Sequence, residues 1–156
     1  MFAVPENTIA LRPAVSAAHP ARIAAEYARD RDRWAHLLRY DPDDRYAALI
    51  TADELFEVWL LSWLPGQTTG LHDHGGAEGA FTVVTGTVSE RVIRGGTEVL
   101  HEVAAGQSRV FGIDYVHQVH NAGVDPAVTI HVYRPSRVPM REYRFDPVGG
   151  LTSLES

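Results

Sequence analysis

From Glu57 onward, apolar and polar residues alternate in short runs rich in Val, Ile, Thr and aromatic residues, and Gly, Pro and Asp separate the runs. A period of two residues is typical of a β-strand with one buried face. We find no stretch between the runs that would form a crossover helix, so we expect the strands to pair antiparallel. The predicted strands cover residues 56–64, 80–84, 87–93, 97–102, 108–111, 115–120, 127–133 and 143–145. Strands of this kind predict a mainly β sandwich or small barrel.

The residues before this region follow a helical pattern. In the Ala- and Arg-rich segment 16–40, four large apolar residues recur at spacings of four, seven and four, which places them on one face of an amphipathic helix. These residues are Ile23, Tyr27, Trp34 and Leu38. The sequence Asp41-Pro42-Asp43-Asp44 predicts the end of this helix, and we expect a second short helix over residues 45–49.

The composition fits one globular domain. The chain has 156 residues, of which 45% are apolar, and this is enough for a sizeable core. We expect a single domain over residues 1–156, with an N-terminal helical segment at 1–50, a β-barrel at 51–146 and a C-terminal tail at 147–156. Residues 151–156 are expected to be loose.

Charge and hydropathy limit the partners and the location. The net charge of −6 leaves no basic field that would attract a nucleic acid. No apolar run approaches the roughly 20 residues that a bilayer requires, and residues 1–6 lack the pattern of a secretory signal. We therefore expect a cytoplasmic protein without nucleic-acid or membrane partners.

The sequence His72-Asp73-His74 places two histidines at alternate positions. On an extended strand both imidazoles project from one face and Asp73 projects from the other. The chain contains no Cys, so disulfides, Cys-ligated zinc and thiol nucleophiles are excluded. Any metal site must therefore be built from histidines and carboxylates.

The surroundings of this pair resemble the two signature motifs of the cupin superfamily, G(X)5HXH(X)4E(X)6G and G(X)5PXG(X)2H(X)3N. The residues that carry the resemblance are Gly66, His72, His74, Gly86, Gly106, Gly112, His117 and Asn121. The resemblance implies a jelly-roll-like antiparallel β-barrel in which His117 completes a three-histidine set. His120, three positions later, faces away from His117 on a strand, so we expect a supporting or structural role for it.

The position at which most cupins carry a fourth ligand, a Glu, is Gly79 here. Glu78 is one residue away and would point to the opposite side of a strand. The expected ligand set is therefore three neutral imidazoles, which leave a divalent ion its full charge and open positions.

Further features, between residues 45 and 135, resemble the cysteine dioxygenase branch of the thiol dioxygenases. Thr129, His131 and Tyr133 alternate along one predicted strand and so face the same way, and Arg45 precedes the first sheet strand. In that family three His bind Fe(II), an Arg holds the substrate carboxylate, and a Ser-His-Tyr relay places a phenol beside the iron.

The resemblance assigns a role to each matching residue of this chain. His72, His74 and His117 would bind one Fe(II) per chain, and Arg45 would hold the carboxylate. The relay would consist of Thr129, His131 and Tyr133, with Thr129 retaining the hydroxyl of the family's Ser.

In mammalian members of this family a Cys at the position of Gly79 is cross-linked to the tyrosine. This chain has no Cys, so Tyr133 is expected to be a free phenol. Bacterial members commonly carry Gly there, which points to a bacterial-type enzyme. Family members also have a cis X-Pro bond just after the tyrosine, and Arg134-Pro135 occupies that place.

The resemblance implies an enzyme that adds both atoms of O₂ to the sulfur of L-cysteine and gives cysteine sulfinic acid. A close alternative is the same reaction on 3-mercaptopropionate or another small thiol. That sister group generally carries Gln where the cysteine enzymes carry Arg, so Arg45 favours cysteine. A second alternative is a non-catalytic cupin that binds a metal or small ligand. The expected assembly is a monomer or a small homo-oligomer.

Overall fold

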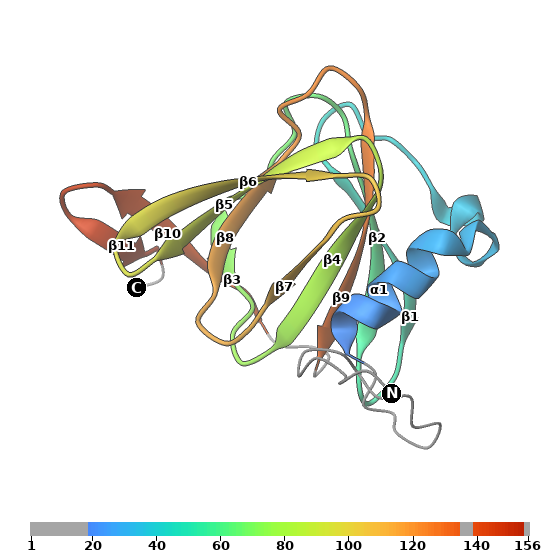
Figure 1. The fold of residues 1–156 in the computed structure, drawn as a ribbon, viewed down its shortest axis with the longest axis horizontal. Helices are drawn as coiled ribbons and strands as arrows, with labels where there is room; N and C mark the ends of the chain where they lie inside the picture. Colours follow the sequence, from blue (N-terminus) through green and yellow to red (C-terminus); the bar gives the residue numbers. More distant parts are fainter. Residues whose placement is uncertain (1–18, 135–138, 155–156) are drawn as a thin grey trace, which may run out of the picture.

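The computed structural model describes residues 19–134 and 139–154 (Figure 1). In this part of the chain the one α-helix is α1, Pro20–Arg29, and 3-10 turns follow at Arg31–Arg33 and Ala35–Leu37. The strands are β1 (Tyr46–Ala52), β2 (Glu57–Trp63), β3 (Leu71–Asp73), β4 (Glu78–Thr85), β5 (Thr87–Arg94), β6 (Thr97–Ala104), β7 (Ser108–Phe111), β8 (Val116–His120), β9 (Ala127–Arg134), β10 (Arg141–Asp146) and β11 (Gly150–Ser153).

The strands form two sheets that face each other, and α1 covers the outer face of one of them (Figure 1). The first sheet has the order β1-β2-β9-β4-β7, and the second has the order β11-β10-β3-β8-β5-β6. Every strand pair described is antiparallel, as the sequence predicts.

Alternate residues of β2 and β9 belong to two separate hydrophobic cores. Val58 and Leu60 of β2 pack with Ile23 of α1 outside the sheet, whereas Leu61 and Trp63 pack between the two sheets. Both faces of these central strands are therefore buried, and alternate residues of β9 face the interior of the barrel.

The helix is shorter than predicted. His19 caps its start, because the ring Nδ1 accepts the backbone N–H of Ala21 at 3.0 Å. At the other end, the carbonyl of Tyr27 accepts both the N–H of Asp30 and the indole N–H of Trp34, and the chain continues in 3-10 turns. The indole of Trp34 thus satisfies an end carbonyl that a longer helix would have used. No described helix is long and apolar enough to cross a membrane.

Two predictions about secondary structure were wrong. Residues 45–49 were expected to be helical, but residues 46–49 begin β1, which pairs with β2 from Tyr46 opposite Ser62 to Ala52 opposite Glu57. Pairing with a buried neighbour overrides the weak helical preference of this Ala-rich segment. Residues 151–153, expected to be loose, form β11 with β10 as partner. The Arg134-Pro135 bond, at the place of the family's cis X-Pro bond, extends outside the described residues.

Candidate metal centre

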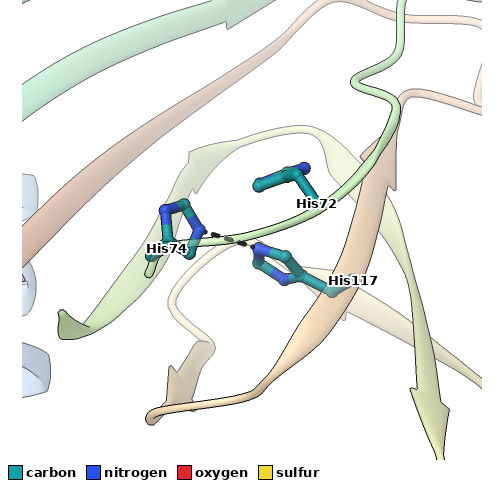
Figure 2. Close-up of side chains that lie close together, drawn as sticks. All are labelled: His72, His74 and His117. Carbon is teal, nitrogen blue, oxygen red and sulfur yellow. Dashed lines mark hydrogen bonds between the residues drawn. The ribbon is translucent and has the colours of Figure 1, made fainter. Parts of the chain in front are cut away.

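Three histidines meet inside the barrel. His72 lies on β3 directly opposite His117 of β8, and His74 follows one residue after β3 ends. One nitrogen from each ring lies within 4.8 Å of the others, and all three side chains are buried. Figure 2 shows the rings converging on one point from these two segments. The sequence predicted this set of three residues.

Hydrogen bonds orient two of the rings. Nδ1 of His72 lies 2.8 Å from the carbonyl oxygen of Gly70, and Nδ1 of His117 lies 2.7 Å from a carboxylate oxygen of Glu90. Both partners only accept, so Nδ1 carries the proton in each ring and the lone pair lies on Nε2. Nε2 of His117 lies 3.1 Å from Nε2 of His74. This nitrogen-only arrangement fits a borderline transition metal.

Burial keeps these rings uncharged. Burial, together with the neighbouring histidines, lowers the pKa of His72 to about 4 and that of His74 to about 2. At pH 7 both rings are therefore neutral, which is the form that binds a metal.

The carboxylates near the motif point elsewhere. Asp73, between the two ligands, faces away and binds Arg141 at 2.7 Å and the hydroxyl of Tyr143 at 2.7 Å. Glu78 is exposed and forms an ion pair with Arg134 at 2.6 Å. In the described residues, the three histidines are the one group of His, Asp or Glu side chains close enough to share an ion.

A second set of polar groups follows β9 on its inner face. The hydroxyl of Thr129 lies 2.7 Å from Nε2 of His131, and Nδ1 of His131 lies 3.4 Å from the hydroxyl of Tyr133. The structure thus places the three residues of the predicted relay in one row. Burial lowers the pKa of His131 to about 3, so this ring is also neutral.

A hydrogen bond from Trp63 bears on which atoms donate and which accept along this row of residues. Its indole N–H donates to the Thr129 hydroxyl oxygen at 2.9 Å, and an indole can only donate. Thr129 can then donate its own proton to Nε2 of His131, and with that tautomer the His131 proton lies on Nδ1 and points to the Tyr133 oxygen. The sequence gave no sign of this hydrogen bond, because Trp63 and Thr129 lie 66 positions apart.

Tyr133 lies beside the histidines. Its ring centre is 4.7 Å from that of His74, and burial raises the pKa of its hydroxyl, so the phenol is protonated at neutral pH. The residue opposite Tyr133 on β4 is Gly79.

The three histidines, His131 and Tyr133 border one cavity of about 420 Å³. Arg45, immediately before β1, lies at this cavity, where its guanidinium is 3.4 Å from the Thr68 carbonyl oxygen and 3.6 Å from a carboxylate oxygen of Asp44. Glu57 and Glu142 also line the cavity, and the sequence did not single them out. The cavity therefore combines a cationic group with two carboxylates around the histidines.

The comparisons with known proteins agree with this arrangement. A family model for cysteine dioxygenase type I matches residues 7–144, which is most of the chain. The chain belongs to the cysteine dioxygenase type I family. No match to a curated protein was found. Together with the three-histidine site, membership of the cysteine dioxygenase type I family indicates a metal-dependent cupin of the dioxygenase class.

Solved structures with the same architecture support the predicted cupin fold of this cysteine dioxygenase family member. The protein TT1209 from Thermus thermophilus is 28% identical, with a TM-score of 0.57 over 65% of this chain and 92% of that chain. A Klebsiella pneumoniae protein with a double-stranded β-helix domain is 19% identical, with a TM-score of 0.61 over 68% and 90%. An oxalate oxidase in complex with the substrate analogue glycolate is 16% identical, with a TM-score of 0.56 over 64% and 55%.

Sequence reasoning missed Glu90, although a signal was present. Val88, Glu90 and Val92 alternate on one face of a predicted strand, and all three are buried in the barrel. A carboxylate between two apolar residues on a buried face is rare unless it is paired. Burial alone would raise the pKa of Glu90, but hydrogen bonds and charges from His117 and Arg109 hold that pKa below its usual value.

Proposed function

We propose that this protein is an Fe(II)-dependent thiol dioxygenase that oxidises L-cysteine with O₂ to cysteine sulfinic acid. The observation that carries the proposal is the convergence of three imidazoles, a phenol and an arginine on one cavity in a member of the cysteine dioxygenase type I family. In the overall reaction the sulfur is oxidised, O₂ is the oxidant, and both of its atoms enter the sulfinate product.

One Fe(II) per chain would be held by His72, His74 and His117. Imidazole suits iron, and three neutral ligands leave the ion its full charge, which favours an anionic thiolate. When bound, the iron would supply the redox centre at which thiolate and O₂ react. The protein itself contributes a face of three buried imidazole rings.

Arg45 would bind the substrate carboxylate. A guanidinium can hold a carboxylate through two parallel charge-assisted hydrogen bonds, and the side chain of Arg45 is still 31% exposed at the cavity. Glu57 and Glu142 add negative charge to the same cavity. This distribution suits a zwitterion such as cysteine better than 3-mercaptopropionate, which has no ammonium group.

Tyr133 would act as a hydrogen-bond donor within the cavity. With the His131 proton on Nδ1, the Tyr133 oxygen would accept it, and the phenol proton would be directed elsewhere and be available to substrate or oxygen. Thr129 and His131 would hold the phenol in this orientation. We therefore assign catalytic and substrate-binding roles to Tyr133 and supporting roles to the other two residues.

The test is anaerobic reconstitution with Fe(II), followed by oxygen-consumption assays with L-cysteine, 3-mercaptopropionate and cysteamine. We expect the fastest turnover with L-cysteine and a sulfinate product. Preference for 3-mercaptopropionate would favour the sister activity. Tight metal binding without oxygen consumption with any of the three thiols would favour a non-catalytic cupin. The cytoplasmic location, the oligomeric state and the single domain over 1–156 remain predictions from the sequence.

A further inference from the structure

Glu90 is a fully buried carboxylate in the middle of β5. Three donors surround it. Nδ1 of His117 lies 2.7 Å and the hydroxyl of Tyr115 lies 3.0 Å from Oε2, while Nε of Arg109 lies 2.7 Å from Oε1. These contacts join Glu90 to β7 through Arg109 and to β8 through His117.

The chemistry of this cluster favours a carboxylate. Each of the three neighbours presents an N–H or O–H to Glu90, and an ionised carboxylate offers acceptors only. An amide would bring an NH₂ group against at least one of these donors. A buried polar group that loses its hydrogen-bond partner destabilises the folded protein, so the ionised carboxylate is the form that satisfies all three donors.

That arrangement determines which nitrogen of His117 faces the other two histidines. With Nδ1–H donated to Glu90, the lone pair of Nε2 is directed toward His74 and the proposed ion position. His72 obtains the same orientation from the backbone carbonyl of Gly70, which no side-chain substitution removes. Of these two anchored ligands, His117 is the one that depends on a side chain.

We propose that Glu90 is a positioning residue of the metal centre, which fixes the ring orientation and the Nδ1–H tautomer of His117 so that Nε2 is ready to bind the ion. This inference rests on the metal site of the proposed function. Partners of metal-binding imidazoles typically contribute 10- to 100-fold to metal affinity, and we expect an effect of about that size for Glu90.

The first test measures the affinity for Zn(II) by competition with a chromophoric chelator, so no turnover is needed. The parent should bind one ion, Glu90→Gln should bind about 10- to 100-fold more weakly, and Tyr115→Phe should stay close to the parent. Tyr115→Phe is the matched control, because it removes a donor from the same carboxylate oxygen and leaves the bond to His117. Parental affinity in Glu90→Gln would overturn the inference. Failure of the parent to bind would instead overturn the metal site.

The second test needs no variant at Glu90. In the Zn(II)-loaded parent, long-range ¹H–¹⁵N correlation spectra should show His117 with its proton on Nδ1, protected from exchange with water. His117→Gln provides the assignment. A His117 ring with a rapidly exchanging Nδ1 proton would contradict the role of Glu90. Should Glu90→Gln fail to fold, this spectrum decides the question.

Discussion

Gly79 lies directly opposite Tyr133 in the antiparallel pair β4–β9. A Cβ atom on Gly79 would meet the backbone carbonyl oxygen of Val132 and would lie 2.7 Å from the ring of Phe111. The backbone therefore has no space for a side chain at the position where mammalian members of the family carry the cross-linked Cys. Tyr133 is a free phenol here because the chain contains no Cys, and the packing at Gly79 also leaves no space for one.

Gly79→Cys should accordingly destabilise the protein and form no cross-link to Tyr133. Forcing extra atoms into a packed core typically costs about 1–3 kcal/mol. Gly76→Cys is the matched control, because a Cβ there meets nothing within 4 Å. Chemical denaturation and intact mass after turnover check both points. Equal stability of the two variants, or a mass loss of two hydrogens in Gly79→Cys, would contradict this packing argument.

Tyr133→Phe should lower kcat by about 10²–10⁴, the range typical of a general acid–base or hydrogen-bonding group. Its iron content should stay near that of the parent, because the phenol is not one of the three nitrogen ligands. His131→Ala should resemble it, and the double variant should lose less than the product of the two effects, since the groups act as a unit. Parental turnover in Tyr133→Phe would reduce the row on β9 to a packing feature.

Arg45→Ala should raise KM for L-cysteine about 10- to 100-fold, since hydrogen bonds to charged groups contribute about 1.5–3 kcal/mol. Cysteamine has no carboxylate, so its KM should change little. Arg94→Ala, at an exposed arginine near the end of β5, is the control. Equal changes for the two thiols would show that Arg45 does not bind the carboxylate.

The metal-free protein should lose stability as the pH falls below about 6.5. Burial lowers the pKa of His72 to about 4, of His131 to about 3 and of His74 to about 2, whereas an unfolded histidine titrates near 6.5. Between pH 6.5 and 4 the unfolded chain therefore binds more protons, and each histidine reduces the free energy of unfolding by up to about 1.4 kcal/mol per pH unit.

Urea unfolding of the metal-free protein at pH 7, 6 and 5 measures this slope. His131→Asn removes one of the three imidazoles whose pKa is lowered, and it should make the slope shallower. A free energy of unfolding that stays constant from pH 7 to 5 would mean that these rings are not buried in the neutral form.

The strand pattern and the histidine motif made most of this fold predictable. Alternation along residues 127–133 predicted a strand, and the same alternation placed Thr129, His131 and Tyr133 on one face, where the structure has them. The strand β1 was predicted as a helix because its Ala and Leu residues favour a helix and no alternation of apolar and polar residues indicates a strand there. The short strand β3 was missed because only three residues pair there.

The supporting residues of the site were harder to predict, since their partners are far away in the sequence. Trp63 reaches Thr129 across 66 positions, and Glu90 reaches His117 across 27. Such contacts follow from the pairing of β2 with β9 and of β5 with β8. The position of Glu90 on an apolar strand face indicates that its carboxylate has a partner. This signal does not identify the partner residue.

In the proposed reaction, three histidines of one chain support the transfer of both oxygen atoms to a thiol. The most direct measurement reconstitutes the protein anaerobically with Fe(II), adds L-cysteine and isotopically labelled O₂, and determines the product by mass spectrometry, with His117→Gln as the metal-site control. We predict cysteine sulfinic acid that carries two labelled oxygen atoms from the parent and none above background from His117→Gln. Cystine with hydrogen peroxide, or a sulfinate with only one labelled atom, would contradict the account.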